Sequence, residues 1–281
     1  MRRALTILSM SAVLLGTSAT ARADEPRPLD VNPWVSGTVT VLGATGWIGS
    51  ELGKASLVPT QCRWCDRTAD GRDTVPGIDE SVRNGLKWND IKTPATISDV
   101  VGFAGLPVLL LGGLAVASAH ESAAKKIPED FLVTIEEVML AADLNQLVKF
   151  SFARERPFVH ALTDAQKAST AAPADNDLSF YSGHTTLAFS LATSAATVAT
   201  LRGYRWAPAL WAVGLPMAAF VGYLRIAADK HYFTDVMTGA LLGSAFGVAI
   251  PMLHRVRVNA GSGVSMQLVP MGAGLALAGT F

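Results

Sequence analysis

The stretch that decides the fold is residues 207–253, APALWAVGLPMAAFVGYLRIAADKHYFTDVMTGALLGSAFGVAIPML. It contains two long apolar runs, Ala207–Ala227 and Tyr232–Leu253, separated by a short polar turn. Each run is long enough for a buried helix or a membrane span. Further segments of helical period are Ser98–Ala119, Phe131–Phe150 (which also carries charges) and Thr185–Leu201. The pattern predicts an all-α protein, a bundle of five to six helices.

Small residues and the chain ends complete the predicted organisation. Gly239, Gly243 and Gly247 repeat at helical spacing on one face, which lets a neighbouring helix approach closely. The Gly-rich tail alternates weakly and favours a short β-hairpin. We therefore expect a signal peptide at 1–23, an N-terminal segment with a Cys-x-x-Cys loop at 24–97, a helical-bundle domain at 98–257 and the tail at 258–281.

Composition excludes several classes of protein. The 281 residues carry 23 Lys and Arg against 23 Asp and Glu, so no excess of positive charge is available for a nucleic-acid surface. Charged residues make up 16% of the chain, below the roughly 25% of an ordinary soluble domain, and 50% are hydrophobic. The mean hydropathy is +0.33, so the chain can bury a large apolar core, in part against lipid.

Residues 1–23 have the pattern of a secretory signal peptide. Arg2 and Arg3 form a positive start, Ala4–Gly16 is apolar, and Ala21-Arg22-Ala23 fits a cleavage site of small residues. An uncleaved membrane anchor is the alternative. In either case the sequence predicts export.

The two cysteines, Cys62 and Cys65, are too few for a disulfide-stapled scaffold or a cysteine-rich zinc domain. In an oxidising compartment we expect them to form a structural disulfide. A redox pair is the alternative, although no thioredoxin-like βαβ pattern surrounds them. No matching pair of ligands lies nearby for zinc, so no metal site is predicted.

Polar residues gather where the predicted helices end and begin. In an up-and-down bundle, the C-terminal end of one helix and the N-terminal end of the next helix lie at the same end of the bundle. The connection two helices further along the chain lies at that end again. The sequence therefore predicts one cluster of three cations, two histidines, a serine, a glycine and an aspartate: Lys149, Arg156, Ser182, Gly183, His184, Arg225, His231 and Asp235.

This set of side chains suits a phosphate. Arg forks bind phosphate oxygens bidentately, and Lys adds a point charge. Ser182 stands where a helix N-cap would stand, so the N–H groups that follow can face an anion. His231 and Asp235 are four residues apart, and we expect them to share a helix face, with the carboxylate holding one ring nitrogen. His184 on another helix can then act as an acid.

The three motifs Lys149-x6-Arg156-Pro157, Ser182-Gly183-His184 and Arg225-x5-His231-x3-Asp235 resemble the signature of the type 2 phosphatidic acid phosphatase and vanadium haloperoxidase superfamily. The similarity covers about Ser98–Leu253. The resemblance implies a metal-free phosphohydrolase with a phosphohistidine intermediate.

By the same resemblance, His231 is the nucleophile, Asp235 its orienting partner and His184 the general acid. The remaining five residues of the cluster would bind the phosphoryl oxygens. The sequence departs from the pattern at Tyr181, where the family has Pro, and at Leu224, where it often has Ser. Tyr181 removes no catalytic group and could line the leaving-group pocket, which puts substrate preference in question.

Other functions remain as alternatives. A vanadium-dependent haloperoxidase would use vanadate as its cofactor. A phosphatase of this kind would need no cofactor, and vanadate would inhibit it. A protein that only captures phosphate would not need a nucleophile and an acid. Residues 43–49, GATGWIG, imitate a dinucleotide-binding turn, but no βαβ continuation follows, and helix packing is the preferred interpretation.

The expected substrate is a phosphorylated lipid or a small phosphoester, and no nucleic-acid partner is expected. Loops opposite the cluster carry Lys125 with Lys126, Arg202 with Arg205, and Arg255 with Arg257. If the helices span, the positive-inside rule places these loops in the cytoplasm and the cluster on the periplasmic side of an inner membrane. A soluble periplasmic bundle, like the soluble acid phosphatases of the superfamily, is the alternative.

Overall fold

A computed structural model describes residues 25–59, 61–256, 265–271 and 274–280. The predicted signal peptide at 1–23 and the first part of the tail lie outside these residues. The α-helices are α1 (Pro33–Leu52), α2 (Lys54–Leu57), α3 (Gly77–Leu86), α4 (Lys92–Val100), α5 (Leu106–His120), α6 (Ile127–Phe152), α7 (Asp164–Ala168), α8 (Gly183–Arg202), α9 (Ala207–Ala227) and α10 (Phe233–Leu253). Short helical turns are η1 (Val101–Gly105), η2 (Ala124–Lys126), η3 (Pro157–Val159) and η4 (Pro173–Asp175). The all-α fold class is confirmed.

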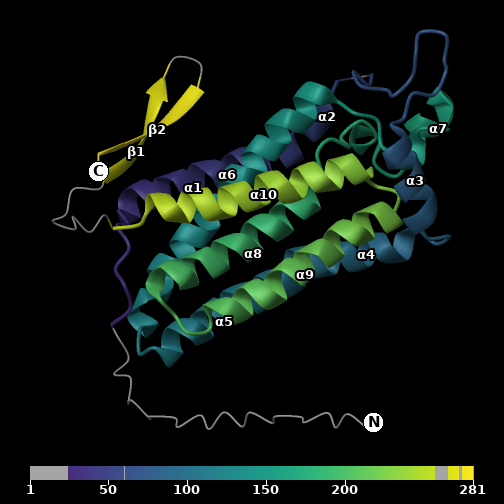
Figure 1. The fold of residues 1–281 in the computed structure, drawn as a ribbon. Helices are drawn as coiled ribbons and strands as arrows, with labels where there is room; N and C mark the ends of the chain where they lie inside the picture. Colours follow the sequence, from purple (N-terminus) through teal and green to yellow (C-terminus); the bar gives the residue numbers. More distant parts are fainter. Residues whose placement is uncertain (1–24, 60, 257–264, 272–273, 281) are drawn as a thin grey trace, which may run out of the picture.

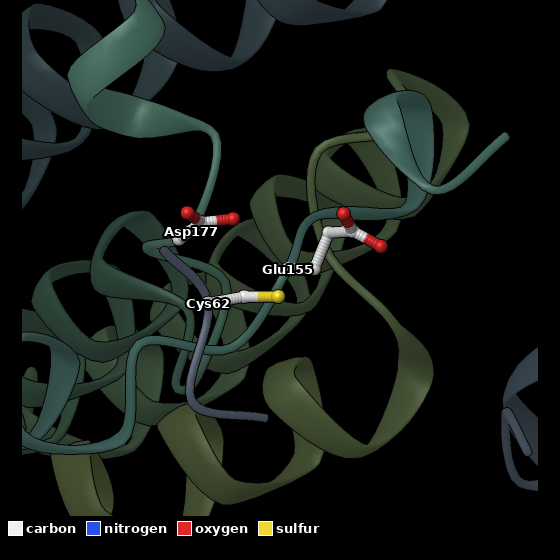
Figure 2. Close-up of side chains that lie close together, drawn as sticks. All are labelled: Cys62, Glu155 and Asp177. Carbon is white, nitrogen blue, oxygen red and sulfur yellow. The ribbon is translucent and has the colours of Figure 1, made fainter. Parts of the chain in front are cut away.

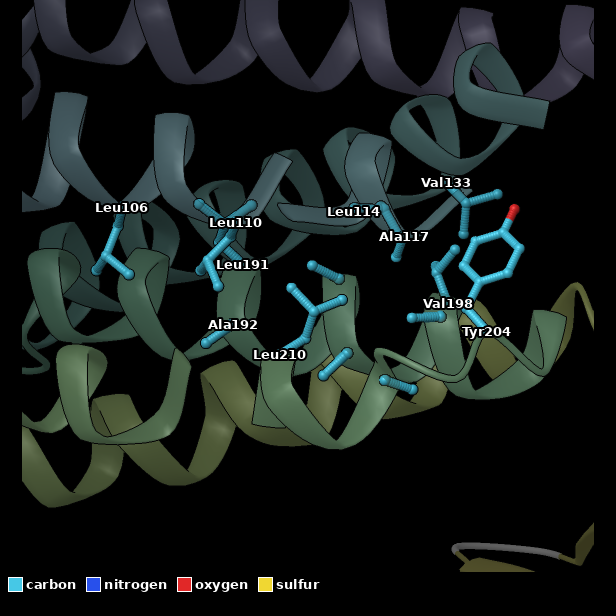
Figure 3. Close-up of a cluster of buried hydrophobic side chains, with 14 of the residues drawn as sticks. Leu106, Leu110, Leu114, Ala117, Val133, Leu191, Ala192, Val198, Tyr204 and Leu210 are labelled. Carbon is cyan, nitrogen blue, oxygen red and sulfur yellow. The ribbon is translucent and has the colours of Figure 1, made fainter. Parts of the chain in front are cut away.

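Helix α8 is the centre of the bundle, and α5, α6, α9 and α10 pack around it (Figure 1). The sequence of α8 is rich in alanine, serine and threonine, and these small side chains allow four helices to pack closely against it. Leu106, Leu110 and Leu114 repeat every fourth residue on α5 and form one wall of the core against α8 and α9 (Figure 3). Leu191 and Leu210 meet them from those two helices.

The glycine stripe of α10 packs directly on the backbone of α8. A Cβ atom added at Gly243 would lie 2.5 Å from the carbonyl oxygen of Thr186, and one at Gly247 would lie 2.6 Å from that of Ser190. Neither distance is possible for a real Cβ, so only glycine permits this approach. The close packing predicted from the glycine spacing is confirmed.

Helix α1 packs on α6 through its own small residues. A Cβ at Gly43 would lie 2.9 Å from Met139 Cβ, and one at Gly46 would lie 3.2 Å from Asp143 Oδ1. Residues 39–49 are helical throughout, so the dinucleotide-binding alternative, which needs a strand before the glycines, is wrong. The glycines are packing positions.

The apolar run expected from Ser98 belongs to a longer helical segment that begins at Lys92. α4, η1 and α5 are continuous, and η1 is a π-helical turn in which Leu106 N–H donates to the carbonyl of Val101. Pro107 follows directly, and proline has no N–H to continue the regular ladder at this point.

Three described helical segments are long and apolar enough to cross a membrane: Lys92–His120, Ala207–Ala227 and Phe233–Leu253. Only 22%, 39% and 28% of their most apolar windows are buried inside the protein. Large side chains such as Val108 on α5 and Leu241 on α10 are 75% and 70% exposed. An apolar exterior of this extent indicates a membrane protein.

The C-terminal strands β1 (Ser265–Met271) and β2 (Gly274–Thr280) pair antiparallel. Ser265 lies opposite Thr280, and Met271 lies opposite Gly274. The pair lies apart from the helices in Figure 1.

Candidate active site

A cavity of about 580 Å³ opens where the C-terminal ends of α6 and α9 meet the N-terminal end of α8. Helices α1 and α4 supply further parts of its wall. Six of the eight residues predicted to cluster line it: Lys149, Arg156, Gly183, His184, Arg225 and His231. The other two, Ser182 and Asp235, are fully buried behind the wall.

The first two cations are brought to the cavity by the end of α6. Lys149 lies in the last turn, and the helix stops at Ala153, which adopts a left-handed conformation with φ of 43°. The chain then runs extended, and Arg156 N–H donates to the carbonyl of Asn176 at 2.8 Å. This turn directs two basic side chains from neighbouring positions into one cavity.

Two cations of the cavity have no ion-pair partner among the described side chains. Lys149 and Arg156 form no ion pair with any side chain in the described part of the chain, although Arg156 is only 7% exposed. Nε of Arg156 and Nε of Arg225 are buried without a hydrogen-bond partner among the described atoms. Burial lowers the pKa of Arg156. Because unpaired buried charge is costly, the cavity favours an anionic ligand.

The start of α8 adds backbone donors to this cavity. Ser182 is the N-cap, as predicted, but its hydroxyl is bonded to Thr185 Oγ1 at 2.9 Å instead of capping the helix. A Cβ at Gly183 would lie 2.8 Å from Lys149 Nζ, so glycine lets the ammonium group approach the helix start. The first N–H groups of a helix have no intrahelical acceptor and attract anions.

His231 is buried and its Nδ1 lies 2.7 Å from the carbonyl oxygen of Ser179. A carbonyl can only accept, so Nδ1 donates and Nε2 is left as the unprotonated nitrogen. Burial, followed by the positive charge of Arg156, holds the pKa of His231 well below its usual range. The imidazole is therefore neutral at physiological pH.

The relation between His231 and Asp235 differs from the expected shared helix face. α10 begins at Phe233, so His231 precedes the helix, while Asp235 lies in its first turn. Asp235 Oδ2 is 3.8 Å from His231 Nδ1, and it instead accepts from Ser179 Oγ at 2.5 Å and Tyr232 N–H at 2.9 Å. The carboxylate acts on the imidazole through Ser179.

His184 contacts an acid that the sequence analysis passed over. Its Nε2 lies 2.7 Å from Asp99 Oδ1, and the same oxygen lies 3.3 Å from Nη1 of Arg225. Phe103 packs with its ring centre 4.7 Å from the imidazole. Burial, followed by the positive charge of Arg225, lowers the pKa of His184 to about 4. A lone acid within an apolar run is the sequence signal that could have revealed Asp99.

The lining of the cavity differs from the prediction at two further residues. Lys230 lines the cavity beside His231, with its ammonium 4.2 Å from the ring centre of Phe158, and it was not predicted. Tyr181, for which the sequence left open a place in a leaving-group pocket, is 1% exposed and is not among the residues that line the cavity. Its carbonyl accepts a hydrogen bond of 2.8 Å from Asn145 Nδ2.

Cys62 and Cys65 are joined by a disulfide in the structure. Ligand atoms of Cys62, Glu155 and Asp177 lie within 4.8 Å of one another (Figure 2). The sulfur is already bonded, and Glu155 binds Arg67 at 3.1 Å and His160 at 2.8 Å. Protein contacts therefore engage two of the three side chains, and we assign no metal to the group.

Comparison with known proteins finds one family model and one solved structure that are similar to this chain. Residues 132–258 match the PAP2 superfamily. No curated protein matches the chain. Among solved structures, the chain is similar to the first transmembrane PAP2-type phosphatidylglycerolphosphate phosphatase from Bacillus subtilis, with 17% identity and a TM-score of 0.46 over 74% of this chain and 96% of that one.

Proposed function

We propose that this protein is a phosphatase that hydrolyses phosphomonoesters or diphosphates without a metal ion, and the match of residues 132–258 to the PAP2 superfamily supports this proposal. One observation carries the proposal. Lys149, Arg156 and Arg225 come from separate places in the chain to a single cavity that also holds two imidazoles. Fixed cations suit the oxygens of a phosphoryl group, and the imidazoles supply a nucleophile and an acid.

In the proposed first step, Nε2 of His231 attacks the phosphorus atom. The bond from phosphorus to the leaving oxygen breaks as the new P–N bond forms, and His184 gives that oxygen its proton. Water then attacks the phosphohistidine, with His184 taking one of its protons, and inorganic phosphate leaves with the P–N bond broken. His231 starts neutral, as its buried environment favours.

Negative charge on the phosphoryl group must be stabilised in both proposed steps, and we call the groups that would do so the cation cradle. The three basic side chains, together with the N–H groups of Gly183 and His184, can bind the equatorial phosphoryl oxygens. Ser182 sets the start of the helix from which these N–H groups point. Asp235 holds Ser179, whose carbonyl fixes the imidazole of His231.

We propose a phosphorylated lipid as substrate. The cavity wall combines the cations with apolar side chains, Trp47, Phe103 and Leu187, from three helices. Phe103 is 51% exposed on a segment long enough to span a membrane. A headgroup could therefore occupy the charged part of the cavity while its acyl chains stay in apolar surroundings.

We propose an exported protein with the site facing the periplasm. Lys125, Lys126 and Arg205 lie in connections at the end opposite the cavity, which the positive-inside rule assigns to the cytoplasm. Arg202 does not contribute as expected, because it is 1% exposed and binds Asp130 at 2.7 Å. The protein need not be membrane-bound for its chemistry, so fractionation must accompany the assay.

A phosphate-release assay on detergent-purified protein tests the function. We expect release from phosphatidic acid, phosphatidylglycerol phosphate or a polyprenyl diphosphate at higher kcat/KM than from p-nitrophenyl phosphate, with inhibition by vanadate. Halide oxidation in the presence of vanadate would favour a haloperoxidase instead. Absence of phosphate release from every substrate would overturn the proposal.

His231→Ala is the variant that tests the nucleophile. We expect loss of turnover by about 10⁴-fold or more in protein that still shows a cooperative thermal unfolding transition, because alanine has no group that can form the bond to phosphorus proposed for Nε2 of His231. His120→Ala, an exposed histidine at the opposite end of the bundle, is the matched control and should keep full activity. Unchanged turnover in His231→Ala would exclude the phosphohistidine mechanism.

A further inference from the structure

We propose that Arg154, held by Asp66 and Asp79, is a positioning residue for the His231–Asp235 pair. This inference rests on the proposed function. It assigns a part in catalysis to residues 62–79, which precede the matched family region. None of these three residues lines the cavity, so they act through other groups and do not touch the substrate.

The guanidinium of Arg154 is fully buried and uses each of its three nitrogens. Nε donates to Asp66 Oδ2 at 3.0 Å, and Nη2 donates to Asp79 Oδ2 at 2.9 Å. Nη1 donates to Asp235 Oδ1 at 2.7 Å and to Thr234 Oγ1 at 2.9 Å. Asp235 therefore has its outer oxygen fixed by an arginine that two other carboxylates hold in place.

Two aromatic rings fix the plane of this guanidinium. Its Cζ lies 4.3 Å from the ring centre of Trp64 and 4.3 Å from that of Tyr232. Trp64 Nε1 also donates to Asp66 Oδ1 at 2.7 Å. Cation–π contact on both faces, with hydrogen bonds along the edge, leaves Arg154 one orientation.

Asp79 ties the start of α10 to the same group. Its Oδ1 accepts from the backbone N–H of Thr234 at 2.8 Å, and its Oδ2 accepts from the hydroxyl of Thr234 at 2.7 Å. Thr234 is the residue before Asp235. An aspartate on α3 thus fixes both the backbone beside the Asp235 carboxylate and the arginine that binds it.

Arg154 also reaches His231 through its backbone. The carbonyl of Arg154 accepts from Ser179 N–H at 2.9 Å, and the carbonyl of Ser179 accepts from His231 Nδ1. Ser179 Oγ donates to Asp235. One residue therefore sets the position of both groups that orient the imidazole. Displacement of a reacting group by about 1 Å can lower a rate roughly 100-fold.

The experiment compares Asp79→Asn and Asp66→Asn with Asp73→Asn. Asp73 lies between them in sequence, is 64% exposed at its side chain and contacts His160 instead of Arg154, so it is a matched control. We expect the two network variants to lower kcat roughly 10- to 100-fold, with KM and the inhibition constant for vanadate within about twofold of wild type. Thermal unfolding in detergent reports on the fold.

A loss of kcat at constant KM would indicate that the variant misplaces the His231–Asp235 pair. A general structural defect would also disturb the cation cradle and would therefore change KM as well. A kcat equal to that of Asp73→Asn in folded Asp79→Asn and Asp66→Asn overturns the proposal. Should either fail to fold, Trp64→Phe, which removes one hydrogen bond to Asp66 and keeps the ring, decides in its place. If wild type releases no phosphate, the proposed function has failed; if wild type turns over and the network variants match the control, only this inference has failed.

Discussion

At the scale of single residues, the site is built from groups whose charge is set by burial. The imidazole of His231 is kept neutral by burial and by the cations around it, which suits a nucleophile. His184 is the proposed acid and must carry a proton in that role, yet burial lowers its pKa to about 4. A bound phosphate dianion would favour the protonated imidazole.

The depressed pKa of His184 predicts a falling rate as pH rises. Above pH 4 the protonated acid of the free enzyme becomes scarcer, so kcat/KM for an alkyl phosphate should decline from roughly pH 5 to pH 8. An aryl phosphate has a better leaving group and should show a smaller decline. His184→Ala should remove the difference in slope between the two substrates; an unchanged difference would contradict the assignment of His184 as acid.

Asp99→Asn should have effects of opposite sign on binding and on turnover. The carboxylate of Asp99 holds Arg225 and His184, so it competes with phosphate for both. Its removal should lower the inhibition constants for phosphate and vanadate several-fold, while kcat on alkyl phosphates falls because His184 loses a partner for its proton. Weaker vanadate binding in the variant would show that Asp99 supports the cradle instead.

At the scale of the elements, helix packing brings the motifs together. The stripe of glycines on α10 allows it to lie on the backbone of α8, so Asp235 and Ser182 come into contact: Ser182 N–H donates to the carbonyl of Asp235 at 3.1 Å. The end of α6 is turned by Ala153, which sends Arg156 back across the same site. The geometry of the cavity thus depends on small residues far from any substrate.

Gly243→Ala should destabilise the protein by about 1–3 kcal/mol, because the added methyl group meets the backbone of Thr186 and the two helices must separate. The measurement is chemical or thermal unfolding in detergent. Gly49→Ala on α1 is the control, since its Cβ would contact nothing within 4 Å, and it should be neutral or stabilising by up to about 1 kcal/mol. Equal stability of both variants would show that α8 and α10 pack less closely.

At the scale of the whole molecule, the N-terminal segment and the helical bundle form one functional unit. Backbone bonds join the disulfide loop to the end of α6: Arg63 N–H donates to the carbonyl of Ala153, and Glu155 N–H donates to that of Trp64. We expect these backbone hydrogen bonds to hold the loop in the folded protein when the Cys62–Cys65 bond is reduced.

Reduction of Cys62–Cys65 should therefore lower stability more than activity. The disulfide closes a loop of only four residues. For a loop of this length, the entropy of the unfolded chain predicts that reduction lowers the free energy of unfolding by about 2 kcal/mol. We expect kcat to change by less than about twofold while the unfolding midpoint falls. Free thiols in protein isolated from an oxidising compartment would refute the disulfide, and a large loss of kcat at constant stability would show that it shapes the site.

The class of the fold and six of the residues that line the cavity could be predicted from the amino-acid sequence alone. Apolar runs of helical length and the spacing of Gly239, Gly243 and Gly247 require helices that pack closely, and the order of the polar residues puts Lys149 and Arg225 at one end. These features could be predicted because the length of an apolar run, its helical period and the direction of a helix are all set by residues close together in the sequence.

Which groups contact the two histidines depends on how the helices and loops pack in three dimensions. Asp99, Ser179 and Arg154 carry no local signal that links them to His184 or His231, because their contacts join positions about 50 to 85 residues apart in sequence. Whether Asp235 touches His231 or Ser179 depends on where α10 begins, and that is set by Asp79 from a distant helix. Side-chain contacts across the bundle, and not spacing along it, fix the chemistry of the site.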